Sequence, residues 1–287
     1  MEATTVQDVE WWIGQVAKGL SGRNFDGPRF LRPYHFAIVG NAAYRAGATR
    51  IFVPAFFGPY AARMHLWQAI GLEAPQEVAE RNPGGRFFPL TPIKSEHGAE
   101  VVADGIRDVF KTCGTTDNRA LRAIEIMLSE ILGNCFFHSK MSADIRGLAC
   151  AQSWPDRNLA QVAVVDTGVG IRRTLGQNPA YSVRLKSENA NELATELGVT
   201  GKPDGRHSGY GLTVARQLMQ NHGGNLLVLS GDEAFRAWGR KSRGRTLLHP
   251  WQGTIVIMEW NMDRPLDVSA VYAAWPQPDE DAAFVFT

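Results

Sequence analysis

The pattern of apolar and polar positions indicates an α/β module in the first third of the chain. Short apolar runs at 35–39 and 51–56 predict strands, and the stretches at 41–47 and 60–72 predict helices. A strand-like run at 86–90 follows a segment rich in Pro, Glu and Gly. Strands that alternate with helices are typical of an α/β layer.

A long amphipathic helix opens the second part of the chain. Asp117 is a suitable N-cap, and an apolar stripe with three- and four-residue spacing follows it. The stripe consists of Leu121, Ile124, Met127, Leu128, Ile131, Leu132 and Cys135. An apolar strand at 161–165, a helix at 213–221 and a second apolar strand at 255–258 come next. This order predicts helices packed on a sheet.

Length and composition agree with two domains. The chain has 287 residues, 44% hydrophobic and 21% charged, which is typical of a globular protein rather than a disordered or fibrous one. With a boundary at 91–98, we expect an N-terminal α/β module at 1–95, a second domain at 99–265 and a C-terminal tail at 266–287. The expected fold class is α/β or α+β, with a two-layer sandwich in the second domain.

A row of polar side chains runs beside the apolar stripe. Glu130, Asn134 and His138 recur at four-residue intervals, so they stack along a second face of the same helix. By itself the row is equally typical of a solvated helix face.

Two glycine-containing turns follow this helix. Asp166 ends the first apolar strand, and Gly168 and Gly170 in the next turn would let a ligand approach the backbone. Gly209 and Gly211 precede the helix at 213–221, where backbone N–H groups can hold phosphate oxygens. Each turn alone is also a common turn or capping sequence.

Other nucleotide-binding and catalytic motifs do not occur in the sequence. A dinucleotide-binding fingerprint would need Gly or Ala at the position of Arg173, and no G-x-x-x-x-G-K-[ST] phosphate loop is found. Neither an H-E-x-x-H zinc helix nor a G-x-S-x-G nucleophile turn is present. A Rossmann or P-loop site is therefore excluded.

Taken together, the motifs resemble those of the GHKL superfamily, the ATP-binding fold shared by DNA gyrase, heat-shock chaperones, histidine kinases and mismatch-repair ATPases. The family's order is kept by Glu130-x-x-x-Asn134 on a helix, Asp166-x-Gly168-x-Gly170 after a strand, Gly209-x-Gly211-Leu212 opening a helix, and Gly253-Thr254 entering a late strand. The resemblance covers residues 130–258. It implies a Bergerat ATP-binding fold, also called a histidine kinase-like ATPase domain, with ATP and Mg²⁺ as ligands.

The resemblance implies roles for the residues at the adenine end of the site. Asp166 would accept a hydrogen bond from the adenine amino group, and Thr254 would support it through water. The turn that contains Gly168 and Gly170 would let the base approach.

It also implies roles at the phosphate end. Asn134 would ligate Mg²⁺ through its carbonyl oxygen, which suits a hard cation. Backbone N–H groups around Gly209 and Gly211, in the motif completed by Leu212, would cradle the β- and γ-phosphates. Glu130 would orient or deprotonate the attacking nucleophile, a water or a protein hydroxyl.

The stretch 171–207 matches the family's variable ATP lid. It is long and polar, and we expect its Lys202 to contact the nucleotide.

Departures from the family pattern concern the subclass. Sensor histidine kinases usually carry Lys at the position of Phe137, and residues 1–116 offer no long heptad pattern for a dimerisation helix. The run from Asn134 to His138 is more similar to the anti-sigma serine kinases. His138 either contacts the phosphates or the lid, or is only a polar residue of the helix face. The pattern at 34–93 has a faint similarity to STAS-like modules.

Charge and cysteine content bear on partners and compartment. Thirty basic and 29 acidic residues give a net charge of +1, which disfavours nucleic acid as a partner, although Arg236, Arg240, Lys241, Arg243 and Arg245 are clustered. Three cysteines without C-x-x-C spacing favour a reducing cytoplasm. No apolar run is long enough to cross a membrane.

Two functions remain open at this point. The first is an ATPase or protein serine/threonine kinase that acts in regulation. The second is a nucleotide-gated switch, in which ATP closes the lid and controls the binding of a protein partner or homodimerisation.

Overall fold

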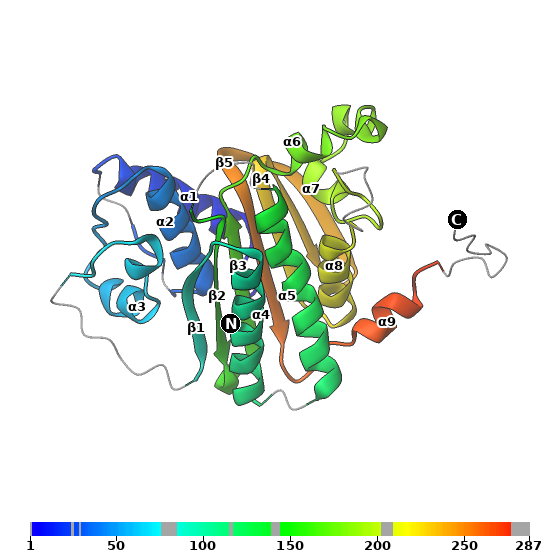
Figure 1. Cartoon of the computed structure of the whole chain (residues 1–287), viewed down its shortest axis with the longest axis horizontal. Helices are drawn as coiled ribbons and strands as arrows, with labels where there is room; N and C mark the ends of the chain where they lie inside the picture. The colour runs from blue at the N-terminus through cyan, green and yellow to red at the C-terminus, as the bar shows by residue number, and fades with distance from the viewer. Residues whose placement is uncertain are drawn as a thin grey trace.

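The structure, a computed structural model, describes residues 2–23, 26–28, 30–75, 85–114, 117–138, 144–201 and 209–276, with the backbone alone at 136–138. Within these ranges the chain forms nine α-helices, four short 3-10 helices and five strands, in a mixed α+β arrangement (Figure 1).

A single five-stranded antiparallel sheet forms the centre of the molecule, with the strand order β1-β2-β3-β5-β4. Its strands are β1 (Phe87–Ile93), β2 (Gly147–Trp154), β3 (Leu159–Asp166), β4 (Asn225–Trp238) and β5 (Lys241–Asn261). The strands expected at 86–90, 161–165 and 255–258 are confirmed as parts of β1, β3 and β5.

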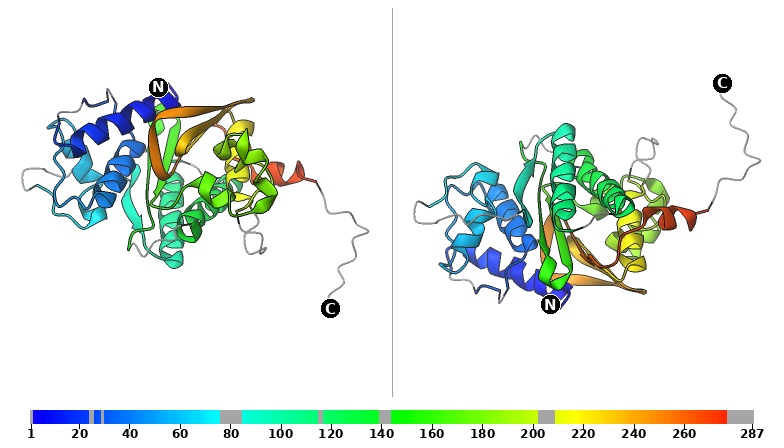
Figure 2. Two further views of the ribbon diagram at one scale, coloured as in Figure 1. Left: turned by 90° about the horizontal axis from the view of Figure 1, so that it is seen from above. Right: turned by 90° about the horizontal axis from the view of Figure 1, so that it is seen from below.

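One face of the sheet is covered by α4 (Glu96–Thr112), α5 (Asn118–His138) and α8 (Gly211–Asn221), as Figure 2 shows from two sides. Val162 and Val164 of β3 point into this core. The stripe on α5 is buried along its whole length, and Asp117 caps the helix by accepting a hydrogen bond of 2.8 Å from the backbone N–H of Arg119. Both predictions for this helix are confirmed.

The other face is covered by α1 (Val6–Leu20), α2 (Pro33–Arg45) and α3 (Gly58–Arg63). Ala163 and Val165, which alternate with the inward residues of β3, belong to this second core. The sheet is therefore buried on both faces and the molecule has three layers, helix–sheet–helix. The expected two-layer arrangement holds only for the sheet with α4, α5 and α8.

The prediction of strands in the N-terminal part is wrong. Residues 35–39 lie inside α2, and the described residues between 2 and 75 form helices and turns without a strand. Because α2 is packed between the sheet and its neighbouring helices, nearly all of its residues from Pro33 to Asn41 are buried. A helix buried on all sides has the same continuous apolar run as a buried strand.

The predicted helix at 60–72 is broken into two pieces. α3 ends at Arg63, His65 takes a positive φ of 54°, and a 3-10 turn, η1 (Gln68–Ile70), follows. Gly71 ends this turn with a φ of 78°, so the expected stop at this glycine is confirmed.

The remaining elements lie between the strands and after the sheet. They are η2 (Pro155–Arg157), α6 (Ile171–Leu175), η3 (Pro179–Tyr181), η4 (Arg184–Lys186), α7 (Ala190–Leu193) and α9 (Val268–Ala273). No helix in the described ranges is both long enough and apolar enough to pass through a bilayer. The division into domains at 91–98 stays a prediction, although Trp12 of α1 and Leu227 of β4 share one apolar core.

A buried carboxylate connects the outer helical layer to the sheet. Glu259 of β5 is 2% exposed and accepts hydrogen bonds from the Thr4 backbone N–H (2.8 Å) and hydroxyl (2.6 Å). It also accepts from Arg32 (2.7 Å), Gln161 (2.6 Å) and Asn225 (2.9 Å). Each donor of this cluster would lose a hydrogen bond if the carboxylate were removed, although Arg32 also bonds to the Thr4 hydroxyl and Asn225 to the Thr4 carbonyl oxygen.

We expect Glu259→Ala to lower the free energy of unfolding by about 3–5 kcal/mol, because the change leaves a buried guanidinium without its counter-ion and removes an acceptor from two buried amides. Denaturant unfolding measures this loss. The matched control is Glu100→Ala on α4, whose carboxylate is 70% exposed and lies 3.4 Å from Nδ1 of the exposed surface residue His97; it should change stability by no more than about 0.5 kcal/mol. Similar losses in both variants would contradict the role given to Glu259.

Candidate functional site

A cavity of about 230 Å³ lies where α5, the end of β3, the middle of β5, α6 and the start of α8 meet. Its volume is more than ten times the roughly 15 Å³ that one water molecule requires, so the cavity suits a small organic ligand. The lining residues include Glu130, Asn134, Asp166, Gly170, Thr174, Leu175, Val199, Gly201, Gly209, Tyr210, Gly211, Leu212 and Thr254.

Asp166, the last residue of β3, places a carboxylate at one end of this cavity. Its Oδ1 accepts a hydrogen bond of 2.7 Å from the backbone N–H of Gly168, and Thr254 donates from both its side chain and its backbone. Burial raises the pKa of Asp166 to about 6, and these hydrogen bonds and Arg45 oppose the rise. The group is therefore a buried, ionised acceptor at neutral pH.

Gly253 lies in a β-bulge within β5, and this local turn of the chain brings β5 against the end of β3. Gly253 has a φ of +88°, and a Cβ there would lie 2.3 Å from the Asp166 carbonyl oxygen and 3.0 Å from its Oδ1. The carbonyl oxygen of Gly253 accepts a hydrogen bond of 2.7 Å from Ser230, whose Oγ in turn accepts from the N–H of Ile171 at 2.9 Å. Gly170 also borders Ser230, since a Cβ at Gly170 would lie 2.8 Å from Oγ. Glycine is needed at 253 for both its conformation and its contact.

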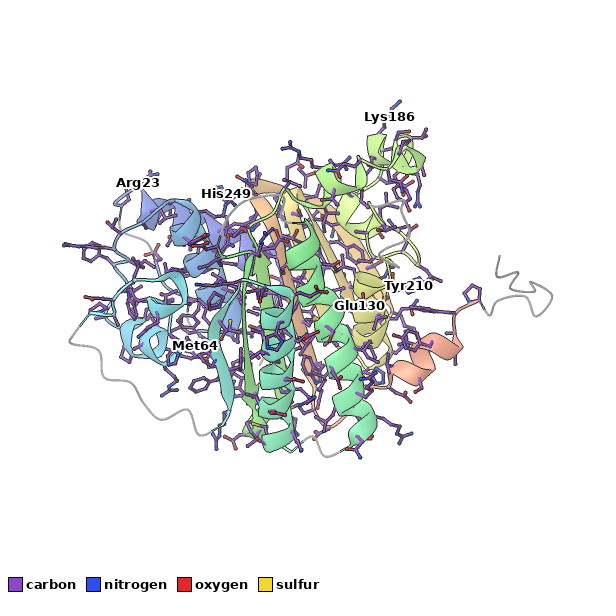
Figure 3. The ribbon with its side chains drawn as sticks, in the orientation of Figure 1. Arg23, Met64, Glu130, Lys186, Tyr210 and His249 are labelled. Atoms are coloured by element: carbon purple, nitrogen blue, oxygen red, sulfur yellow. The ribbon has the colours of Figure 1, made fainter. Side chains whose placement is uncertain are left out.

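The opposite wall is formed where α5 meets the first residue of α8. A Cβ at Gly211 would lie 2.8 Å from Cβ of Glu130 and 3.3 Å from Nδ2 of Asn134. Figure 3 shows Glu130 on α5 and Tyr210 just before α8, both of which line the cavity. Glu130 stays open to solvent, yet partial burial raises the pKa of its carboxyl group.

The N-terminus of α8 faces the cavity without a side-chain cap. The residue at its N-cap position is Tyr210, which makes no capping hydrogen bond, and Gly211 and Leu212 of the first turn line the cavity. The first N–H groups of a helix have no partner within the helix and carry partial positive charge. This end of the cavity therefore favours an anionic group.

The segment 171–201 closes one side of the cavity. Sequence led us to expect a long polar loop, but the segment contains short helices around a small core of Leu175, Leu193 and Ala194. Arg172 holds it to β4 through a bidentate ion pair with Glu233, with N–O distances of 2.9 and 2.7 Å.

Most of the site residues expected from sequence come together in this cavity. Glu130, Asn134, Asp166, Gly170, Gly209, Gly211, Leu212 and Thr254 all line it. Gly168 is not among the lining residues, but its N–H orients the Asp166 carboxylate. Lys202 and the side chain of His138 lie outside the part of the chain that the structure describes.

Sequence reasoning missed three residues that shape the site. Ser230 joins the turns at Gly170 and Gly253, and Asn41 of α2 donates a hydrogen bond of 3.2 Å to the Asp166 carbonyl oxygen from the outer layer. Tyr210, at the N-cap position of α8, lines the cavity. A usable signal was present for two of them, because Ser230 interrupts an apolar strand and Asn41 is a polar residue in an apolar run.

The described residues contain no group of three or more His, Cys, Asp or Glu side chains that could hold a metal ion together. Asn134 has a side-chain carbonyl oxygen at the cavity wall, which is a suitable single ligand for a hard cation that a bound molecule and water also coordinate.

Comparison with models of known protein families gives no match to this chain, and comparison with curated protein sequences gives none either.

We expect Gly253→Ala to cost about 2–4 kcal/mol of stability, since it adds strain at a positive φ and a clash with Asp166. Gly231→Ala is the matched control, because Gly231 has a φ of +64° and nothing within 4 Å of an added Cβ. The control should cost only about 1 kcal/mol. Denaturant unfolding compares the two, and equal costs would show that the contact with Asp166 is unimportant.

Proposed function

We propose that the cavity binds Mg-ATP and that the chain is a GHKL-type ATPase or protein serine/threonine kinase with a Bergerat fold at 99–265. The observation that supports the proposal best is that separate sequence motifs meet in one place. Residues from four motifs, spread over positions 130–254, line one cavity with a carboxylate at one end and a helix N-terminus at the other. Chance turn and capping sequences have no reason to meet in this way.

The carboxylate end has the chemistry to recognise adenine. An ionised Asp166 can accept but not donate a hydrogen bond, so it favours the exocyclic amino group of adenine and disfavours the carbonyl oxygen that guanine carries there. Thr254 donates directly to Asp166 rather than through water, which fixes the orientation of the carboxylate. Burial makes an unpaired carboxylate costly and so strengthens the selection.

The other end suits the phosphates and a magnesium ion. The uncapped first turn of α8 offers backbone N–H groups to phosphate oxygens. Asn134 borders the same turn, and its carbonyl oxygen is a hard ligand of the kind that Mg²⁺ uses together with phosphates and water. When bound, the ion would neutralise charge on the phosphates during transfer.

Glu130 is the residue that we propose acts on the nucleophile. It lies one helical turn before Asn134 and beside Gly211, so its carboxylate is next to the expected position of the terminal phosphate. The raised pKa makes it a stronger base than an ordinary glutamate. Glu130 would accept the proton of an attacking water or protein hydroxyl, and the leaving group would be ADP.

A nucleotide-gated switch is the second candidate, and the segment 171–201 favours it. This segment lines the cavity through Thr174, Leu175, Val199 and Gly201, and its outer part carries exposed side chains such as Val183, which is 73% exposed. A ligand that contacts the inner side could change the surface offered to a protein partner or a second copy of the chain.

We expect Glu130→Gln to reduce release or transfer of the terminal phosphate by about 10²–10⁴-fold while ATP binding changes little. The measurement follows γ-labelled ATP into inorganic phosphate or into protein, beside a separate binding titration. Glu125→Gln is the control, as it makes the same change on the same helix, where Glu125 pairs with Arg122. Unchanged turnover in Glu130→Gln would remove Glu130 as the base. Label that stays in bound ATP in the wild type would favour the switch.

We expect Asp166→Asn to weaken ATP binding about 10–100-fold, because it removes a charge-assisted hydrogen bond and offers a donor to adenine's amino group. Binding of ATP to the wild type should also weaken as the pH falls through about 6, since protonation removes the acceptor. Titrations at pH 5 to 8 measure both effects. Asp263→Asn, on an exposed turn, is the control, and equal affinities for Asp166→Asn and the wild type would contradict adenine recognition by Asp166.

A further inference from the structure

The last turn of α2 contacts the proposed adenine site from behind the sheet. Asn41 is fully buried, and its Nδ2 donates to the carbonyl oxygen of Asp166 at 3.2 Å. Its Oδ1 accepts no hydrogen bond from the described residues. A buried amide whose oxygen is unpaired lowers stability, so packing alone gives no reason for an asparagine at position 41. Its hydrogen bond to Asp166 does give one.

Arg45 lies one helical turn after Asn41, on the same side of α2. Its guanidinium donates a hydrogen bond of 2.6 Å to the carbonyl oxygen of Gln252, the residue before the Gly253 turn. Between them, Tyr44 accepts a hydrogen bond of 3.2 Å from the N–H of Ile145, and the carbonyl oxygen of Ile145 accepts from the Thr167 hydroxyl. The C-terminal end of α2 therefore contacts Asp166 and Gln252 directly, and it reaches Thr167, in the turn after Asp166, through Ile145.

The charges around Asp166 make Arg45 electrostatically relevant. Arg45 from α2 favours the ionised carboxylate, and Thr254 from β5 and the N–H of Gly168 do so by hydrogen bonding. From α5, the thiol of Cys135 faces the carboxylate, but burial raises the pKa of that thiol well above its usual value, so it stays neutral. Among the described groups that act on Asp166, Arg45 supplies the positive charge.

We infer that Asn41 and Arg45 are positioning residues for adenine recognition, through which the N-terminal helical layer sets the orientation and surroundings of Asp166. The inference rests on the proposed ATP site and assigns regulation of that site to a layer without nucleotide-binding motifs. Asn41 fixes the backbone of Asp166, and Arg45 fixes the turn that carries Thr254. A displacement of α2 would therefore change affinity for the base without any change in the cavity wall itself.

The first experiment measures the affinity of the full chain for ATP between pH 5 and 8 in the wild type, Arg45→Met and Arg45→Lys. Loss of the charge should move the acid-induced loss of affinity to higher pH. At pH 6, Arg45→Met should bind about twofold more weakly than the wild type, with no measurable difference at pH 8, because Arg45 is exposed and solvent screens its charge. Arg45→Lys should restore most of the wild-type profile. The nucleotide's own titration is common to all variants and cancels in the comparison.

Arg63→Met is the matched control for this profile. Arg63 belongs to the same helical layer, but its guanidinium packs over the rings of Tyr60 and Phe87 at 5.7 and 5.3 Å. Its replacement should leave the pH profile of binding unchanged even if it lowers stability. A shift in Arg63→Met equal to that in Arg45→Met would overturn the role of Arg45.

The second experiment compares ATP and GTP affinities in Asn41→Ala. Loss of the hydrogen bond should lower the ratio of ATP to GTP affinity about tenfold, because Asp166 is no longer held for the adenine amino group. Asn225→Ala, also a buried asparagine under the outer layer but bonded to Glu259, should keep the ratio. A merely structural defect would lower both affinities together.

The outcomes separate the inference from the proposed function. If the wild type fails to bind ATP, the proposed function is wrong and the inference falls with it. If the wild type binds ATP and neither the pH profile of Arg45→Met nor the nucleotide ratio of Asn41→Ala changes, only the inference is overturned.

Discussion

Burial of the central sheet on both faces is the constraint on which the rest of the structure depends. Alternate residues of β3 enter two different cores, with Val162 and Val164 on one side and Ala163 and Val165 on the other. A polar group on β3 can therefore reach a ligand only where the strand ends. Asp166 stands at this end, where it lines the cavity together with residues of α5 and β5 and accepts a hydrogen bond from α2.

The same constraint explains the polar cluster at Glu259. A buried carboxylate on β5 needs hydrogen-bond donors. Thr4, near the start of the chain, and Arg32, at the N-cap position of α2, supply several of them. Hydrogen bonds are directional, so the cluster fixes the position of the N-terminal end of α2 on the sheet more precisely than apolar packing alone does. Asn41 and Arg45 fix the position of its C-terminal end. The helix is fixed to the sheet by polar contacts at both ends.

The sequence correctly predicted the elements whose hydrophobic periodicity matches the way they are buried. The stripe on α5 and the strand before Asp166 each have one interpretation, and the motif residues Glu130, Asn134, Asp166, Gly211 and Thr254 do line one cavity. The N-terminal layer was misassigned because α2 is buried on all sides from Pro33 to Asn41, which removes most of the helical period from its sequence. Ser230 and Asn41 are visible in the sequence as polar residues in apolar runs, but their partners Ile171 and Asp166 lie 59 and 125 positions away, so no local pattern identifies what they contact.

The long-range contacts of Asn41 and Arg45 indicate that the N-terminal helical layer does more than cover the sheet. A layer that only covered apolar surface would need no polar group at the buried end of α2, and an alanine at position 41 would pack with less loss of hydrogen-bonding capacity. The amide instead donates to the backbone of Asp166 at the proposed adenine end of the cavity, and its own oxygen has no partner among the described residues. Residues 41 and 45 lie on one side of a rigid helix, so they cannot move independently of each other. The geometry of the turns at Asp166 and Gly253 is thus coupled to the placement of α2 as a whole, and through Arg32 and Glu259 to the first residues of the chain.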